Sequence, residues 1–146
     1  DGVTILPTHR LVRDLAAFDT PSLLGTAEKH FSVEPLASAP ELWKQMKELQ
    51  AEHVFGLYPA DLRKFYLLRL KPYLAESGDD EVRMLDVSLL HTLLLEHCLG
   101  IDANKLETQA HVDYEREREI CISMVNAGKY QAAFFLNPAT AGQMQR

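Results

Sequence analysis

The sequence lacks several features that would place it in a functional class. Only two of its 146 residues are cysteines, Cys98 and Cys121, and they do not have the spacing of a metal-binding or redox pair. Both lie in apolar runs, where free cysteines are commonly buried, so we expect a reduced, cytoplasmic protein. The apolar runs are far shorter than the roughly 20 residues that cross a bilayer. We therefore expect no membrane partner.

Positive charge is also scarce. Lys and Arg together number 15 against 21 Asp and Glu, which gives a formal net charge of -6 at pH 7. A general binder of the nucleic-acid backbone needs a basic face, so we expect no nucleic-acid partner. The chain also has no Walker glycine loop and no G-x-G-x-x-G, G-x-S-x-G or H-E-x-x-H run. No motif therefore identifies a catalytic residue.

The six histidines do not assemble a metal site by their spacing. His91 and His97 are six residues apart on one predicted helix, whereas two ligands on one helical face stand three or four residues apart. His111 and Asp113 alternate along a predicted strand and share a face, but two ligands do not make a site. We therefore expect neither a bound metal nor another cofactor.

What is present is an ordinary globular composition, with 47% hydrophobic and 25% charged residues. A chain of this length can bury a stable core without disulfides or bound metals, and we expect one domain over residues 1–146. Periodicity and end signals predict strands at 3–6, 32–36, 53–58, 65–70, 110–115 and 130–138, and helices within 19–31, 38–50, 85–101, 116–129 and from 139 onward.

These elements predict the fold class. The strands at 53–58 and 65–70 stand at hairpin distance, which implies antiparallel pairing. The later strand–helix–strand stretch permits a parallel pair with a right-handed crossover. We predict an α+β fold with a mixed, partly antiparallel sheet and helices packed mainly on one face. The helix within 85–101 is apolar nearly all round, and we expect Leu89 and Leu93 in the core.

The run ILPTHRLV, residues 5–12, carries the most site-like side chains. Pro7 cannot donate a ladder hydrogen bond, so we expect it to end the first strand and Thr8 to turn or cap the chain. At a strand exit, His9 can act as a base and Arg10 can hold a phosphate or carboxylate by a forked contact. The alternative is a capped turn with His9 and Arg10 at a solvent-exposed edge.

A second candidate position closes the last predicted strand. Asn137 stands before Pro138, and an asparagine side chain at that point can bind a ligand. The alternative is that the Asn-Pro pair only ends the strand and starts a helix. The candidate ligand-binding residues are therefore Thr8, His9, Arg10 and Asn137.

Several runs, taken in order, resemble one family. VTILPTHRLV, HVFGLY, LDVSLLHTLLLEHCLGI, VDYERE and GKYQAAFFLNPAT resemble the uncharacterised prokaryotic family named domain of unknown function 1015 over nearly the whole chain. The Pro-Thr-His-Arg, Leu-Asp-Val-Ser-x-Leu-His and Phe-Phe-Leu-Asn-Pro runs are its most specific matches. The polar positions that match, without an implied role, are Thr8, His9, Arg10, Asp86, His91 and Asn137.

The resemblance implies a longer protein. Family members carry an Asp-Gly-His-His-Arg run upstream of Pro-Thr-His-Arg, whereas here Asp1-Gly2 continues as Val3-Thr4. That upstream run is similar to runs in nucleotide-using proteins of the ParB and sulfiredoxin-like class. We therefore expect a fragment, cut at both ends, without a complete active site of its own.

Two further hypotheses stay open. In the first, the chain is part of a nucleotide-dependent phosphotransferase or nucleotide-binding enzyme, and its site binds a nucleotide or small anion once the upstream segment completes it. In the second, it is a protein–protein interaction module whose partner surface is formed by Trp43, Phe55, Tyr58, Phe65 and Tyr66. The same aromatic spacing also fits a core. The substrate and the oligomeric state are left open.

Overall fold

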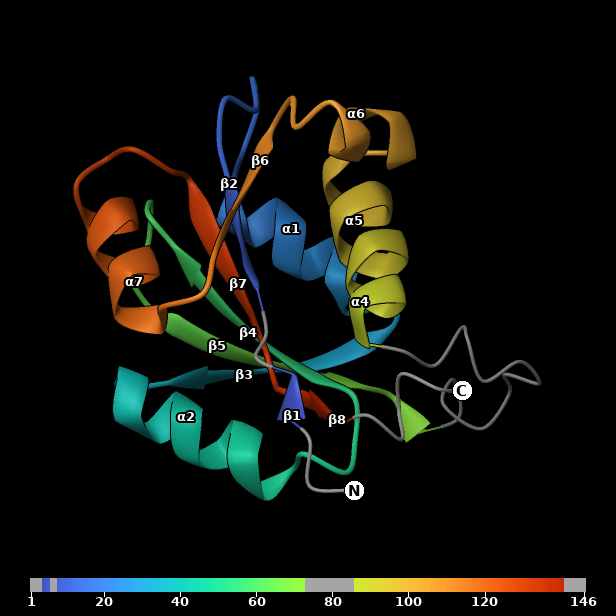
Figure 1. Cartoon of the computed structure of the whole chain (residues 1–146), viewed down its shortest axis with the longest axis vertical. Coiled ribbons are helices and arrows are strands. Elements are labelled where there is room, and N and C mark those ends of the chain that lie inside the picture. The colour runs from blue at the N-terminus through green and yellow to red at the C-terminus, as the bar shows by residue number, and fades with distance from the viewer. Residues whose placement is uncertain (1–3, 6–7, 73–85, 141–146) are drawn as a thin grey trace.

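A six-stranded sheet organises the chain in the computed structural model, which describes residues 4–5, 8–72 and 86–140 (Figure 1). The strand order is β3-β5-β4-β7-β2-β6, and every neighbouring pair is antiparallel. The strands are β2 (His9–Val12), β3 (Phe31–Leu36), β4 (Val54–Pro59), β5 (Phe65–Leu70), β6 (Val112–Glu115) and β7 (Ala132–Leu136). Two short strands, β1 (Thr4–Ile5) and β8 (Ala139–Thr140), form a separate antiparallel pair.

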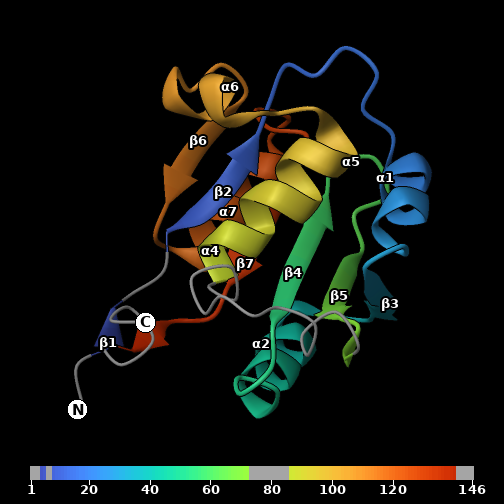
Figure 2. The ribbon, with the colours of Figure 1, turned by 90° about the vertical axis from the view of Figure 1, so that its right-hand side faces the viewer.

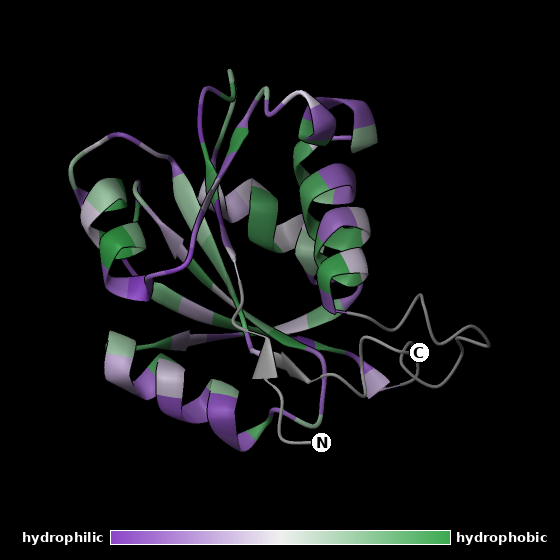
Figure 3. Cartoon of the chain, viewed as in Figure 1, coloured by the Kyte–Doolittle hydropathy of each residue, from purple (hydrophilic) through white to green (hydrophobic). Residues whose placement is uncertain are grey.

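Helices cover both faces of this sheet (Figures 1 and 2). The helical segments are α1 (Thr20–Ala27), α2 (Ala39–Glu48), α4 (Asp86–Leu89), η2 (Leu90–Glu96), α5 (His97–Leu99), α6 (Ala103–Glu107) and α7 (Arg118–Asn126). One core cluster joins the sheet to α1 and η2, and the other joins it to α2 and α7. Figure 3 shows the apolar sides of these helices turned toward the strands. None of the helices in the described segments is long and apolar enough to span a membrane.

The α+β class is confirmed, but two finer expectations are wrong. Pairing among the described strands is antiparallel rather than mixed, because β2 lies between β6 and β7 and pairs with both. The helix-linked strands β6 and β7 therefore run in the same direction without touching. Helices lie on both faces rather than mainly on one, since β4 and β7 are buried along their whole length and need cover on each side.

The local signals around the β4–β5 hairpin and α2 are confirmed. Ser38 begins α2, and its hydroxyl accepts a hydrogen bond from the Glu41 N–H at 3.4 Å. The buried face of α2 then packs tightly on β4 at Gly56. A Cβ at Gly56 would lie 2.9 Å from the Leu42 side chain and 3.2 Å from the Met46 sulfur. The missing side chain at Gly56 thus sets how closely α2 approaches the sheet.

The helical stretch from Asp86 to Leu99 is confirmed, but its core positions are not those expected. It ends at Gly100, whose φ of 73° is the left-handed value that favours glycine. Leu89 and Leu93 are only partly buried against the core, whereas the fully buried leucines of this stretch are Leu90, Leu94 and Leu95. The cause is η2, which is π-helical, so that its wider turn shifts which side chains align.

The remaining expectations differ in part from the structure or lie outside the residues that it describes. The helix predicted within 19–31 is confirmed as α1, and its N-cap is Asp19, whose side chain accepts a hydrogen bond from the Ser22 N–H at 3.0 Å. Ala139 and Thr140 are a strand, β8, and not a helix start. The helix α6 was not predicted, and the short strand β1 covers the middle of the predicted 3–6 strand. The ends of that strand, Pro7 and the remainder of the predicted C-terminal helix lie outside the described residues.

Candidate functional site

His9 and Arg10 lie within strand β2, not in a turn at a strand exit. Arg10 pairs with Tyr114 on β6 and with Phe134 on β7, so β2 is held on both sides. Successive side chains of a strand point to opposite faces, and the sheet therefore separates His9 from Arg10. Both are buried, with exposed fractions of 1% and 6%. The expected position of His9 and Arg10 at a strand exit after a turn at Thr8 is wrong, and so is the alternative of a solvent-exposed edge.

His9 faces the side covered by α2 and α7. Its ring packs edge-on against Phe135 at 5.3 Å between centroids, and its Nδ1 accepts a hydrogen bond from the Leu136 N–H at 3.2 Å. Burial, helped by the charges of Arg118 and Arg10, lowers the pKa of His9 to about 4. His9 is therefore neutral near pH 7 and fixed to β7.

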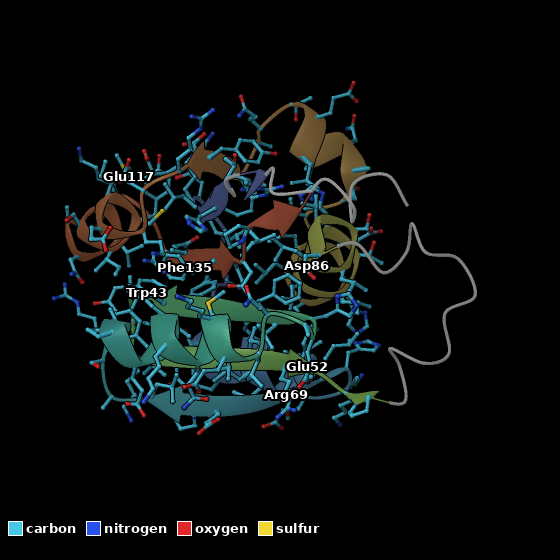
Figure 4. The ribbon with its side chains drawn as sticks, turned by 60° about the horizontal axis from the view of Figure 1, so that its bottom comes forward. Trp43, Glu52, Arg69, Asp86, Glu117 and Phe135 are labelled. Atoms are coloured by element: carbon cyan, nitrogen blue, oxygen red, sulfur yellow. The ribbon has the colours of Figure 1, made fainter. Side chains whose placement is uncertain are left out.

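Asn137 lies at the end of β7 and serves the same face. Its Nδ2 donates to the Met46 carbonyl at 2.8 Å, which fastens the end of β7 to α2. Beside it, the rings of Trp43 and Phe135 pack at 4.9 Å (Figure 4), and the Arg118 guanidinium lies 4.2 Å from the Trp43 ring centroid. On this face the candidate residues His9 and Asn137 thus hold elements together.

Arg10 faces the other side, toward η2. Its Nε and Nη2 donate to Nε2 of His91 at 3.3 and 3.1 Å, and its Nη1 donates to the backbone carbonyl of Thr8. The guanidinium carbon lies 4.8 Å from the centroid of the Tyr114 ring. None of the ion pairs formed within the described residues includes Arg10. Burial lowers the pKa of Arg10, but a guanidinium keeps its charge in proteins.

His91 is a neutral acceptor in this contact. A guanidinium only donates hydrogen bonds, so Nε2 of His91 must be unprotonated. Burial, followed by the nearby charge of Arg10, lowers the pKa of His91 to about 4, which agrees with this assignment. The buried cation of Arg10 therefore contacts an imidazole, a carbonyl and an aromatic ring, none of which carries a negative charge.

The Arg10 guanidinium is close to the surface although the residue is buried. Tyr114 is 38% exposed and lies on β6, the edge strand, and His91 is half-buried. The Arg10 guanidinium thus contacts one exposed and one half-buried side chain. The sequence reasoning missed the pairing with His91 and Tyr114. A histidine on a helix that is apolar nearly all round was a signal for His91, whereas no signal marked Tyr114.

The described residues contain no group of three or more His, Cys, Asp or Glu side chains that could hold a metal ion. The pair His111 and Asp113, which shares a strand face, is engaged elsewhere. Nδ1 of His111 contacts the Arg13 carbonyl at 3.1 Å, and Asp113 accepts from Arg13 at 3.1 Å and from Tyr130 at 2.7 Å. These contacts hold the end of β2 to β6 and the chain before β7.

The aromatic residues of the interaction-module hypothesis do not form an exposed patch. Phe55, Tyr58 and Tyr66 are buried. Trp43 and Phe65 are partly buried and pack against the core cluster on the α2 and α7 side. That hypothesis loses the surface on which it depended.

The comparisons with known proteins identify a family. Residues 1–88 match the model of the family described as Protein of unknown function (DUF1015). The matched residues make up more than half of the chain. The chain therefore belongs to this family, as the resemblance implied. The matched stretch contains Arg10 but neither His91 nor Tyr114. No curated protein and no solved structure matches the chain.

Proposed function

We propose that this chain binds a phosphate-bearing small molecule, such as a nucleotide, with the Arg10 guanidinium as its anion contact. The observation that carries the proposal is a buried arginine whose partners in the described part of the chain are all neutral. Burying a cation without a counter-charge costs several kcal/mol, about the scale of a whole core side chain. Such a group is retained where function requires it.

The chemistry of the side chain favours an oxyanion over other ligands. Arginine presents two parallel N–H donors that match two oxygens of a phosphate or carboxylate, which lysine does not. Folding alone needs no cation here, because Val12, the next residue on the same face of β2, belongs to the apolar core. The simplest role for Arg10 is to meet an anion that arrives from solution.

We place the remaining contacts of the ligand outside the described residues. This follows the expectation that the chain is a segment of a longer cytoplasmic protein and that its site is shared. The proposal is therefore one of binding.

Thermal unfolding with low millimolar sulfate, pyrophosphate, ADP or ATP tests the proposal. An anion at a hundred times its dissociation constant should stabilise the wild type by about 2.7 kcal/mol, which is roughly 5–10 °C for a chain of this size. Arg10→Lys keeps the charge but removes the fork and should lose most of the shift. Arg118→Lys, on the opposite face, is the matched control and should keep it.

Two results would overturn this function. One is an equal shift in Arg10→Lys and the wild type, since a general salt effect does not depend on Arg10. The other concerns the acidic residues at positions 76 and 79–81, which lie outside the described residues. In this case the wild type would bind no anion. Changing the four residues to amides would lower the melting temperature and create anion binding, which would mean that one of these carboxylates already balances the charge of Arg10.

A further inference from the structure

We infer that His91 occupies the ligand's place on Arg10, so that an incoming anion displaces His91 from the guanidinium and binds together with one proton. This inference rests on the proposed anion site and adds to it a regulation by pH. It concerns the same side chains but predicts a different observable, the number of protons taken up on binding.

The forked edge of Arg10 is already filled. Nε and Nη2, the two donors that a bidentate oxyanion would use, both point at Nε2 of His91. Elsewhere in the chain the same edge of an arginine is filled by a carboxylate: Arg69 donates to the two oxygens of Glu52 at 2.6 and 2.7 Å (Figure 4). At Arg10 a neutral ring stands where a carboxylate stands at Arg69.

An anion is the stronger competitor for this edge. The donor is charged in both contacts, but only with an anion is the acceptor charged as well, so that Coulomb attraction adds to the hydrogen bond. An anion that reached Arg10 would therefore replace Nε2 of His91 as acceptor. Nη1 would keep its contact with the Thr8 carbonyl, which holds the guanidinium in place during the exchange.

His91 is placed so that its ring can move while its helix stays. It lies in η2, whose leucines Leu90, Leu94 and Leu95 are fully buried, whereas His91 itself is half-buried. The π-helical turn is a form often found at functional sites. A change in the side-chain torsions of His91 would leave the three leucines in the core.

Displacement also reverses the electrostatics of His91. With the site empty, burial and the Arg10 charge keep the imidazole neutral and lower its pKa to about 4. Among the described residues, Arg10 from β2 is the charged group that lowers this pKa, and Tyr114 from β6 contacts Arg10 in turn. A dianion between the two side chains favours the imidazolium, because opposite charges then alternate. Nε2 of His91 takes up a proton from the buffer, keeps it, and the resulting N–H donates a hydrogen bond to the anion.

Isothermal titration with sulfate tests this coupling, because sulfate itself does not titrate near neutral pH. Measured in buffers with different ionisation enthalpies, wild-type binding should take up close to one proton. This uptake applies between the ordinary histidine pKa of 6.5 and the value of about 4 without the anion, and in that window the affinity should rise by up to about tenfold for each pH unit lowered. His91→Gln should bind without proton uptake or pH dependence. His97→Gln, an exposed histidine of the same helical stretch, is the control and should behave as the wild type.

The outcomes separate this inference from the proposed function. Binding that requires Arg10 but takes up no proton would overturn the inference and leave the anion site standing. Absence of binding in both the wild type and His91→Gln would overturn both. If His91→Gln does not fold, NMR titration of the His91 ring in the wild type decides: sulfate should raise its pKa, and an unchanged pKa would contradict the displacement.

Discussion

Arg10 and Arg13 stand three residues apart in the sequence, and the fold surrounds their positive charges in opposite ways. Arg13 follows the end of β2 and donates to Asp113 at 3.1 Å and to Asp14 at 2.8 Å. Its terminal amino groups also donate to two backbone carbonyls of the chain before β6. The hydrogen bonds to Asp14 and Asp113 raise the pKa of Arg13. Arg10 is more deeply buried, and burial lowers its pKa because its partners are neutral.

The contrast separates a structural arginine from a candidate binding arginine. The charge of Arg13 ties a strand end to a loop, and the residues that balance it are supplied by the neighbouring segments. The charge of Arg10 is not balanced in the described part of the chain. Removing the charge should therefore harm the fold at position 13 and harm binding at position 10.

The largest effect should come from the helix that holds His91 next to Arg10. Leu94 is fully buried in η2, and Leu94→Ala should lower the free energy of unfolding by about 2–5 kcal/mol through the cavity it leaves. Leu93, partly buried one residue earlier, is the matched control and should cost clearly less. Urea denaturation measures both. A larger loss for Leu93→Ala would mean that the π-helical register is misassigned.

His91, which contacts Arg10, and Asp113, which contacts Arg13, should change the stability in different pH windows. His91 has a pKa of about 4 when folded against an ordinary value of 6.5, so the unfolded state binds more protons between these values. Stability should fall as the pH is lowered through this window, by at most about 1.4 kcal/mol per unit and less because the ring is half-exposed and screened. His91→Gln should remove that part of the slope.

The contribution of Asp113, beside Arg13, to the free energy of unfolding should be lost at a lower pH than that of His91. The hydrogen bond from Tyr130, followed by that from Arg13, lowers the pKa of Asp113 from its ordinary value of 3.8. Its contribution is present above that value and is lost as the pH falls below it. Asp113→Asn should therefore leave the slope between about pH 6.5 and 4.5 unchanged. A smaller dependence of stability on pH in Asp113→Asn would mean that Asp113, rather than His91, titrates in that window.

Removing the charge of Arg13 should have a moderate effect on stability. Arg13→Met loses hydrogen bonds to two carboxylates and two carbonyls at a partly exposed site, and we expect a loss of about 1–2 kcal/mol. A double-mutant cycle with Asp113→Asn checks the origin of the loss, since the two changes should be less than additive. Strict additivity would mean that the ion pair contributes nothing.

The smallest loss of stability should come from Arg10 itself. Arg10→Met removes a buried charge that has no counter-charge among the described residues, and replacing buried charges by apolar side chains is often neutral or stabilising. We expect no loss, and a gain of up to about 1–4 kcal/mol, measured by the same urea denaturation. A loss greater than that of Arg13→Met would make Arg10 the structural arginine of the two and reverse the comparison.

Local signals predicted much of the fold, and long-range contacts account for the rest. The β4–β5 hairpin followed from its spacing, and the start of α2 followed from Ser38. The strand order did not follow, because β2 inserts between β6 and β7 from more than a hundred residues away. The pairing of Arg10 with His91 spans 81 residues and is invisible to periodicity.

The candidate site was predicted in part for the same reason. Arg10 was identified by its chemistry, but Pro7 suggested a turn where the chain instead enters a strand paired on both sides. In a turn, His9 and Arg10 could share one groove, whereas in a strand the alternation of side chains places them on opposite faces. The grouping of the residues was therefore wrong, whereas the role of Arg10 as an anion contact stays a prediction.

NMR observation of the arginine Nε–H groups during a sulfate titration tests the central claim most directly, because one spectrum contains both arginines. The Arg10 Nε–H resonance should shift and saturate as sulfate replaces His91. The resonances of Arg13 and Arg69, whose Nε atoms donate to carboxylates, should stay in place. An Arg10 resonance that does not move, or that moves no more than that of Arg13, would contradict the assignment of Arg10 as the anion contact.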